Sequence, residues 1–155
     1  MGKMINIITK NELPGVYKLI SKTCWISWKN YYPKASIDYA VKNLFCLNRL
    51  EKIFSNGQIY GISKDNKIIA CGALKVNNKI GILKIIFVDV DFQKCGIGSQ
   101  IIKFLEDRLV KYGATKSELD SNLSAISFYK KLGYEHKNQV LNYRDGCFVM
   151  EKFLA

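Results

Sequence analysis

The sequence predicts an α+β fold, in which a central mixed sheet of about seven strands is flanked by about four helices. Three observations carry this prediction. Apolar residues recur at helical spacing between residues 11 and 47, three strand-like runs follow between residues 58 and 88, and helices and strands alternate after residue 96. An antiparallel meander, one parallel crossover and a closing hairpin account for this order. With 155 residues, we expect a single domain over residues 1–155.

The first third of the chain predicts a short strand and two helices. Residues 5–9 form the strand, and Asn11 is expected to cap a helix that holds Pro14 in its first turn and continues to Cys24. Ser36 opens a second helical pattern that continues to residue 44, with a separate turn or two over residues 47–54.

The remainder predicts a meander followed by alternating elements. Turns at Asp65-Asn66 and Asn77-Asn78 accept the positive φ of tight hairpins. The third run is nearly continuously apolar, as is typical of a strand covered on both faces. The expected strands are residues 58–63, 67–76, 79–88, 114–119, 134–140 and 147–153, the expected helices are residues 98–112 (closed by Gly113) and 124–131, and the last turn is residues 143–146.

Composition narrows the class of protein. The chain has 24 basic and 13 acidic residues, for a net charge of +11, but Arg49, Arg108 and Arg144 are its only arginines. This lysine bias and the lack of a recognition-helix or stacking motif disfavour a nucleic-acid-binding module. No apolar run has the ~18–20 residues of a membrane span or the pattern of a signal peptide. We therefore expect a cytoplasmic protein with no membrane partner.

The cysteines and the histidine argue against a metal site. The five cysteines are scattered, without a C-x-x-C pair, and His136 is the only histidine. Zinc sites and disulfide frameworks both need closer, regular spacing. We expect reduced thiols and no metal cofactor.

A glycine turn lies between the apolar strand and the longest predicted helix. Gly96 and Gly98 let the backbone turn tightly, and the helix start adds unpaired N–H donors and positive partial charge. Such a site suits a pyrophosphate, although a purely structural turn is an alternative. A Rossmann loop is excluded because Ile101 replaces its third small residue, and the Walker sequence is absent.

Two sequence blocks carry a family resemblance. Residues 87–98 resemble the Q/R-x-x-G-x-G/A acetyl-CoA signature of the Gcn5-related N-acetyltransferases (GNAT), and residues 122–134 (NLSAISFYKKLGY) are similar to that family's N-x-x-A-x-x-F-Y-x-x-x-G-F/Y block. Their order and spacing also match. The resemblance is specific over residues 80–135 and only a pattern over residues 1–57.

This resemblance implies an acetyl-CoA-dependent N-acetyltransferase, in which the primary amine of a small molecule or a protein terminus attacks the thioester directly. Backbone groups of Phe87 and Val88 would pair with the pantetheine arm, the loop amides would hold the pyrophosphate, and Asn122 would contact the arm. The implied cofactor-binding residues are Phe87, Val88, Gln93, Lys94, Cys95, Gly96, Ile97, Gly98, Ser99 and Asn122. A helix N-cap is the structural alternative for Asn122.

The resemblance makes Tyr129 the candidate catalytic residue, with a buried aromatic as its structural alternative. A tyrosine hydroxyl with a pKa of about 10 can protonate a thiolate whose reference pKa is about 8.5. A lysine-like acceptor amine is neutral only about once in 2,500 molecules at pH 7. Ile82 occupies the position where some members carry a glutamate, so we expect ordered water to act as the base.

Two residues in or near the glycine turn differ from those that are frequent in the family. Val90 stands where the family often has proline, and Cys95 where lysine or arginine is frequent. Lys94 keeps one positive charge beside it. Cys95 is expected to serve through its backbone, with a redox-sensitive thiol as the alternative.

In the family the acceptor is selected by the first two helices, the segment between them and the last hairpin, here residues 25–34, 36–47 and 141–146. The aromatic candidates for an acceptor wall are Trp25, Trp28, Tyr31 and Tyr32, which alternatively just cover the core. Residues 1–57 contain only three acidic residues, which favours an acceptor with a carboxylate or phosphate, or a protein terminus. A non-catalytic acyl-CoA-binding sensor and a homodimer both remain open.

Overall fold

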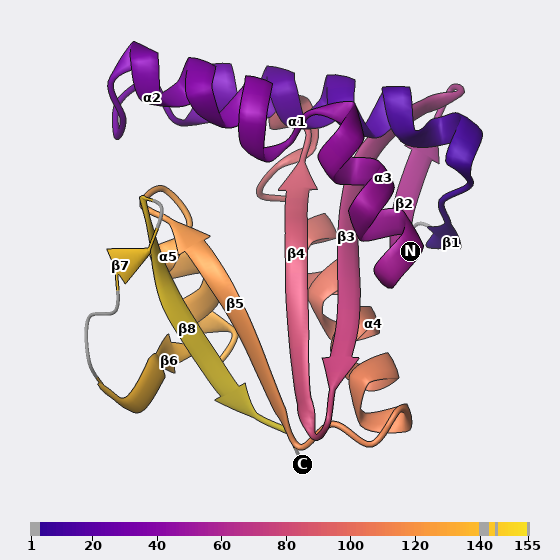
Figure 1. The fold of residues 1–155 in the computed structure, drawn as a ribbon, viewed down its shortest axis with the longest axis vertical. Coiled ribbons are helices and arrows are strands. Elements are labelled where there is room, and N and C mark those ends of the chain that lie inside the picture. The colour runs from indigo at the N-terminus through magenta and orange to yellow at the C-terminus, as the bar shows by residue number, and fades with distance from the viewer. Residues whose placement is uncertain (1–3, 140–142, 145, 155) are drawn as a thin grey trace.

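The computed structural model describes residues 4–139, 143–144 and 146–154. Within these ranges the chain forms one mixed sheet and five α-helices (Figure 1). The helices are α1 (Leu13–Ser27), α2 (Lys34–Tyr39), α3 (Leu47–Asn56), α4 (Ile97–Lys111) and α5 (Ile126–Lys131). The strands are β1 (Asn6–Ile7), β2 (Gln58–Lys64), β3 (Lys67–Asn77), β4 (Ile80–Val88), β5 (Lys116–Asn122), β6 (Glu135–His136), β7 (Tyr143–Arg144) and β8 (Cys147–Phe153).

The strand order is β1-β2-β3-β4-β5-β8-β6, with β7 paired to β8. All described pairings are antiparallel except β4 with β5, whose crossover contains α4. One core cluster lies between α1–α3 and one face of the sheet, and a second lies between the opposite face and α4 and α5. The predicted α+β class and mixed sheet are confirmed.

Several predicted element boundaries are wrong. Asn11 is not a cap, because it lies inside the 3₁₀ turn Lys10–Glu12, where the Glu12 carboxylate accepts the Thr9 backbone N–H at 3.0 Å. Helix α1 continues through Trp25 to Ser27, and α2 runs on as a π-helix over Ala40–Leu44.

The closing hairpin also differs from the prediction. The strand expected at residues 134–140 is only β6, because the chain then forms the 3₁₀ turn Lys137–Gln139 with Asn138 at φ 55°. Tyr143 and Arg144, which were expected in a turn, form β7. Residues 141, 142 and 145 of the expected acceptor segment lie outside the described residues.

Strands β4 and β5 pair only at their beginnings, where residues Ile80 to Leu83 lie beside Lys116 to Leu119. Figure 1 shows the two strands diverging beyond this point into a V. A bulge accompanies the divergence: the β3–β4 register shifts after Cys71, and the buried Ile85 has φ 47°. Positive φ in a β-branched residue is strained, and such strain concentrates at functional sites. The divergence of β4 and β5 therefore identifies this region as the candidate functional site.

No helix in the described ranges is long and apolar enough to cross a membrane.

Candidate active site between β4 and β5

A cavity of about 620 Å³ opens where β4 and β5 separate. Its walls come from the residue that follows α1, from α3, from β3 to β5, from α5 and from the start of β8. Predicted site residues Trp28, Phe87, Asn122 and Tyr129 all line it, together with Cys147, which sequence reasoning missed. Segments that are far apart in the chain thus line one cavity, whose volume is in the range of small-molecule binding sites.

The end of β4 has a free edge on the side of β5. Phe87 pairs with Cys71 of β3 but has no partner in β5, because the parallel pairing ends at Leu83. An unpaired strand edge can bind an extended ligand through main-chain hydrogen bonds. The Val88 carbonyl, expected to be available, instead accepts the Gln93 side-chain amide at 2.8 Å. A ligand at Val88 must therefore share or displace that contact.

The glycine turn places an uncapped helix start next to this edge. Gly96 is the N-cap of α4 at φ 88° and supplies no capping side chain, and Lys94 also has positive φ, 61°. The amides of Ile97, Gly98 and Ser99 therefore lack the partners that an N-cap side chain gives. Apart from Gly96 and its two chain neighbours, no heavy atom of the described residues comes within 4 Å of a Cβ added at Gly96, so this side is open. The residues present fit an anion such as a pyrophosphate.

The two glycines have different roles. A Cβ at Gly98 would stand 3.0 Å from Cζ of Phe128, so this glycine lets α4 pack against α5. Substitution at Gly98 would disturb that packing as well as ligand binding. Cys95 is exposed and its thiol lies 2.7 Å from the Phe92 carbonyl.

Ser99 offers the cleaner test of the anion site, because it is exposed in the first turn of α4. Ser99→Asp should maintain or slightly raise the melting temperature, since an acidic residue here stabilises a helix by about 0.3–1 kcal/mol. The same charge should weaken binding of acetyl-CoA, the donor that the sequence resemblance implies, about tenfold or more, because like charges ~4 Å apart repel by about 1–4 kcal/mol near a surface. Calorimetric titration of each variant with acetyl-CoA measures the change in affinity. Ser99→Asn is the uncharged control, and equal affinities for the two variants would contradict the assignment.

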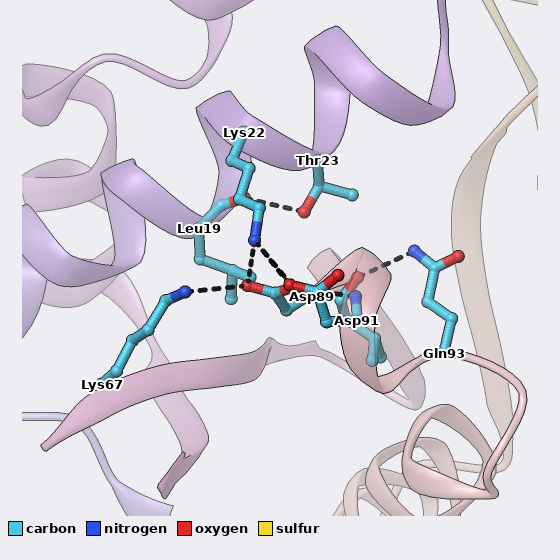
Figure 2. Close-up of polar contacts among 8 residues, drawn as sticks. Leu19, Lys22, Thr23, Lys67, Asp89, Asp91 and Gln93 are labelled. Atoms are coloured by element: carbon cyan, nitrogen blue, oxygen red, sulfur yellow. Dashed lines mark hydrogen bonds and ion pairs between the residues drawn. The ribbon is translucent and has the colours of Figure 1, made fainter. Parts of the chain in front are cut away.

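A buried carboxylate anchors the segment between β4 and the turn (Figure 2). Asp89 is fully buried; Lys22 of α1 lies 3.1 Å from both of its oxygens and Lys67 lies 3.4 Å from one. The backbone N–H of Asp91 donates to Asp89 at 2.9 Å. Burial alone would raise the pKa of Asp89, but these hydrogen bonds and lysines lower it overall. Sequence reasoning missed this cluster.

Tyr129 and Asn122 occupy the opposite arm of the V. Burial raises the pKa of the Tyr129 hydroxyl above its ordinary value, with a smaller contribution from Cys147. The hydroxyl therefore keeps its proton at neutral pH. Asn122 is not the N-cap of α5, which is Ala125; its side-chain oxygen instead accepts the Ser124 N–H at 2.9 Å and fixes the preceding turn.

The four aromatic acceptor candidates have different positions. Trp28 lines the cavity, in ring contact with Phe45 and Phe87. The Tyr32 hydroxyl accepts the Leu123 N–H at 2.9 Å and donates to the Gly146 carbonyl, so it links the segment after α1 to the far arm. Trp25 lines a separate small hollow with Tyr32, and Tyr31 is 51% exposed and outside the cavity lining.

The cavity wall carries both signs of charge. Its lining includes Glu118 and Asp120 on β5, and four cations, Arg49, Lys52, Lys75 and Lys84. Burial alone would raise the pKa of Glu118, but hydrogen bonds from Lys137 and Lys116 lower it. Ile82, opposite Glu118 in the parallel register, adds no carboxylate. Within the described ranges, no group of three or more His, Cys, Asp or Glu residues is arranged to hold a metal.

Comparisons with known proteins agree with this geometry. The family model described as "Acetyltransferase (GNAT) family" matches residues 20–134. The PaiA N-acetyltransferase from Thermoplasma acidophilum, solved with coenzyme A, has a TM-score of 0.85 at 17% identity, covering 99% of each chain. The ribosomal-protein-S18-alanine N-acetyltransferase from Escherichia coli has a TM-score of 0.70 at 19% identity, covering 99% of this chain and 94% of that chain.

A more distant match is N-acetylglutamate synthase from Neisseria gonorrhoeae, solved with coenzyme A and L-arginine, with a TM-score of 0.66 at 13% identity over 99% of this chain and 34% of that chain. No curated protein sequence matches the chain significantly. These structural matches show a shared fold. Because the family model matches more than half of the residues, the chain belongs to the GNAT acetyltransferase family.

Proposed function

We propose that this protein transfers the acetyl group of acetyl-CoA to a primary amine of a small molecule or a protein terminus. The observation that carries the proposal is the V between β4 and β5, which joins an uncapped helix start to a cavity lined by a buried tyrosine. An anion site beside the end of β4 and a proton donor in the wall of the cavity are the parts that acyl transfer from a thioester needs.

Acetyl-CoA binds along the free edge of β4 in this proposal. Amides of the segment from Gln93 to Ser99 hold the pyrophosphate, the backbone at Phe87 pairs with the pantetheine arm, and Asn122 contacts the arm from β5. The Asp89 cluster supports this arrangement because it fixes the chain between Val88 and Gln93. The side-chain contact of Gln93 with Val88 restrains the same turn.

Chemistry takes place in the cavity. The neutral amine of the acceptor attacks the thioester carbonyl, a tetrahedral oxyanion forms, and the carbon–sulfur bond breaks. Tyr129 donates its proton to the departing thiolate, and ordered water takes the proton that the amine loses. Water is the proposed base because Ile82 is apolar and Glu118 is held by two lysines.

Acetyl-CoA should raise the melting temperature of the protein. A ligand that binds only the folded state adds about 2.7 kcal/mol when its concentration is a hundred times Kd. A scan with and without millimolar acetyl-CoA measures the shift, with acetate as the control ligand. No shift would exclude the proposed donor. A shift without thiol release on any amine would instead identify a non-catalytic acyl-CoA sensor.

A further inference from the structure

One wall of the cavity is cationic, and its charges come from three elements. Arg49 and Lys52 lie three residues apart on α3, which places them on neighbouring positions of one helix face. Lys75 belongs to β3 and Lys84 to β4. All four line the cavity, so the positive charge belongs to the tertiary structure rather than to a local run of sequence.

The sheet register places the two strand lysines on the face that α3 covers. Lys84 lies opposite Ala73, and Lys75 lies two residues further along β3, opposite Ile82. Residues that pair directly, or stand two apart in a strand, share one face. Ala73 belongs to the core cluster of α1–α3, so both lysines project to that side of the sheet.

These cations have no acidic partners within the described part of the chain. None of the four forms an ion pair there, whereas Glu118 on the far wall is held by Lys137 at 2.8 Å and Lys116 at 3.3 Å. Positive charge therefore remains uncompensated on the wall formed by α3, β3 and β4. A cavity wall that carries positive charge attracts ligands of the opposite sign to that side of the cavity.

If acetyl transfer is the activity, the geometry points to an anionic acceptor: a primary amine that also carries a carboxylate or a phosphate, held by Arg49, Lys52, Lys75 and Lys84. Arg49 provides the planar fork that binds either oxyanion through two hydrogen bonds. The three lysines add positive charge around it. The acceptor amine then reaches toward Tyr129 on the other arm of the V.

The same charges assist the reaction and select against other acceptors. Nearby cations lower the pKa of a bound ammonium group, which increases the neutral, nucleophilic form. This effect matters here because Ile82 supplies no carboxylate base. Polyamines, whose additional cations would meet the same wall, are disfavoured.

Matched amines test the inference through thiol release from acetyl-CoA. The carboxylate series is 6-aminohexanoate, its amide and 1,6-diaminohexane, which differ in the charge at one end of the same chain. The phosphate series is O-phosphoethanolamine and ethanolamine. We expect kcat/KM for the anionic member of at least one series to exceed that of its neutral partner about tenfold, with the diamine slowest. The series that shows the preference identifies the anionic group.

A charge-reversed variant localises the effect. Arg49→Glu/Lys84→Glu should abolish the anion preference and favour the diamine, because both exposed side chains then carry negative charge. Lys103→Glu/Lys111→Glu has the same change in net charge on α4, on the opposite face of the sheet, and should retain the wild-type order. Raising the salt concentration should weaken the wild-type preference.

The outcomes separate the two proposals. Thiol release in which neutral or dicationic amines do as well as anionic ones overturns the acceptor assignment alone. The same conclusion follows if Arg49→Glu/Lys84→Glu folds and keeps the wild-type order. Absence of thiol release on every amine, with an intact acetyl-CoA melting shift, overturns acetyl transfer itself and the acceptor assignment with it.

Discussion

Tyr129→Phe should lower turnover roughly 10²–10⁴-fold on the best acceptor, the usual range for loss of one general acid. The substitution removes one oxygen and keeps the ring, which packs against Phe128 and Tyr134. The melting temperature and acetyl-CoA affinity should therefore change little. Steady-state kinetics with saturating acetyl-CoA, combined with a melting scan, measures both effects.

The environment of Tyr129 also predicts how activity depends on pH. Burial raises the pKa of its hydroxyl above the ordinary value of about 10, so the proton stays in place through neutral and mildly alkaline pH. Turnover should rise between about pH 7 and 9 as the acceptor amine deprotonates. Tyr129 should cause no loss of activity in that interval. An alkaline decline between about pH 7 and 9 that disappears in Tyr129→Phe would contradict the raised pKa of Tyr129, because it would show that the hydroxyl loses its proton in that interval.

Tyr134 supplies the matched control. It is also buried, and its hydroxyl contacts Ser117 at 2.8 Å and donates to Glu106 at 2.9 Å. Tyr134→Phe should lower the free energy of unfolding by about 1–3 kcal/mol, because the buried Ser117 hydroxyl loses this contact and Glu106 keeps Lys152 but loses the Tyr134 hydroxyl. Turnover below the melting temperature should remain near wild type.

A turnover of Tyr129→Phe within threefold of wild type would show that Tyr129 is not the acid. In that case water protonates the thiolate, or departure of the thiolate does not limit the rate.

The parts of the site that local sequence determines could be predicted. Positive φ at Gly96 and an uncapped helix start follow from the glycine spacing and from the change to helical periodicity. Tyr129 and Asn122 reach the cavity because strand, turn and helix follow one another within a few residues. The order of elements was predictable for the same reason. The ends of the elements were less predictable: the first helical turn starts at Thr9 because the Glu12 carboxylate accepts the Thr9 backbone N–H, and Asn11 lies inside that turn.

The contacts between distant segments could not be predicted. Lys22 and Asp89 are 67 residues apart, and Tyr32 and Leu123 are 91 apart, so no local pattern links them. The cationic wall of the cavity could not be predicted for a related reason. Lys75 and Lys84 share a face only through the strand register, in which Lys84 lies opposite Ala73 and Lys75 lies opposite Ile82. In the sequence they are two more lysines in a lysine-rich chain.

Asp89→Asn should destabilise the protein by about 2–3 kcal/mol, because a buried carboxylate that holds several charge-assisted hydrogen bonds is removed. The loss is smaller than for a fully buried pair, since the Lys22 side chain is 33% exposed and can be hydrated. Acetyl-CoA affinity should also fall, because Asp89 fixes the segment that leads to Gln93. Asp91→Asn is the control: Asp91 also contacts Lys22, but its side chain is 71% exposed, so stability should change little.

The pH dependence of this difference tests its electrostatic origin. The pKa of Asp89 is lowered in the folded protein, so its contribution is fully present above the unfolded pKa of about 3.9 and is lost as pH falls through the folded pKa. Asp89→Asn lacks this contribution at every pH. Urea unfolding of both proteins should therefore show a difference in free energy that is constant near neutral pH and narrows below about pH 4. A difference that stays constant or widens in acid would mean that Asp89 stabilises the fold by packing and neutral hydrogen bonds, because protonation would then leave its contribution intact.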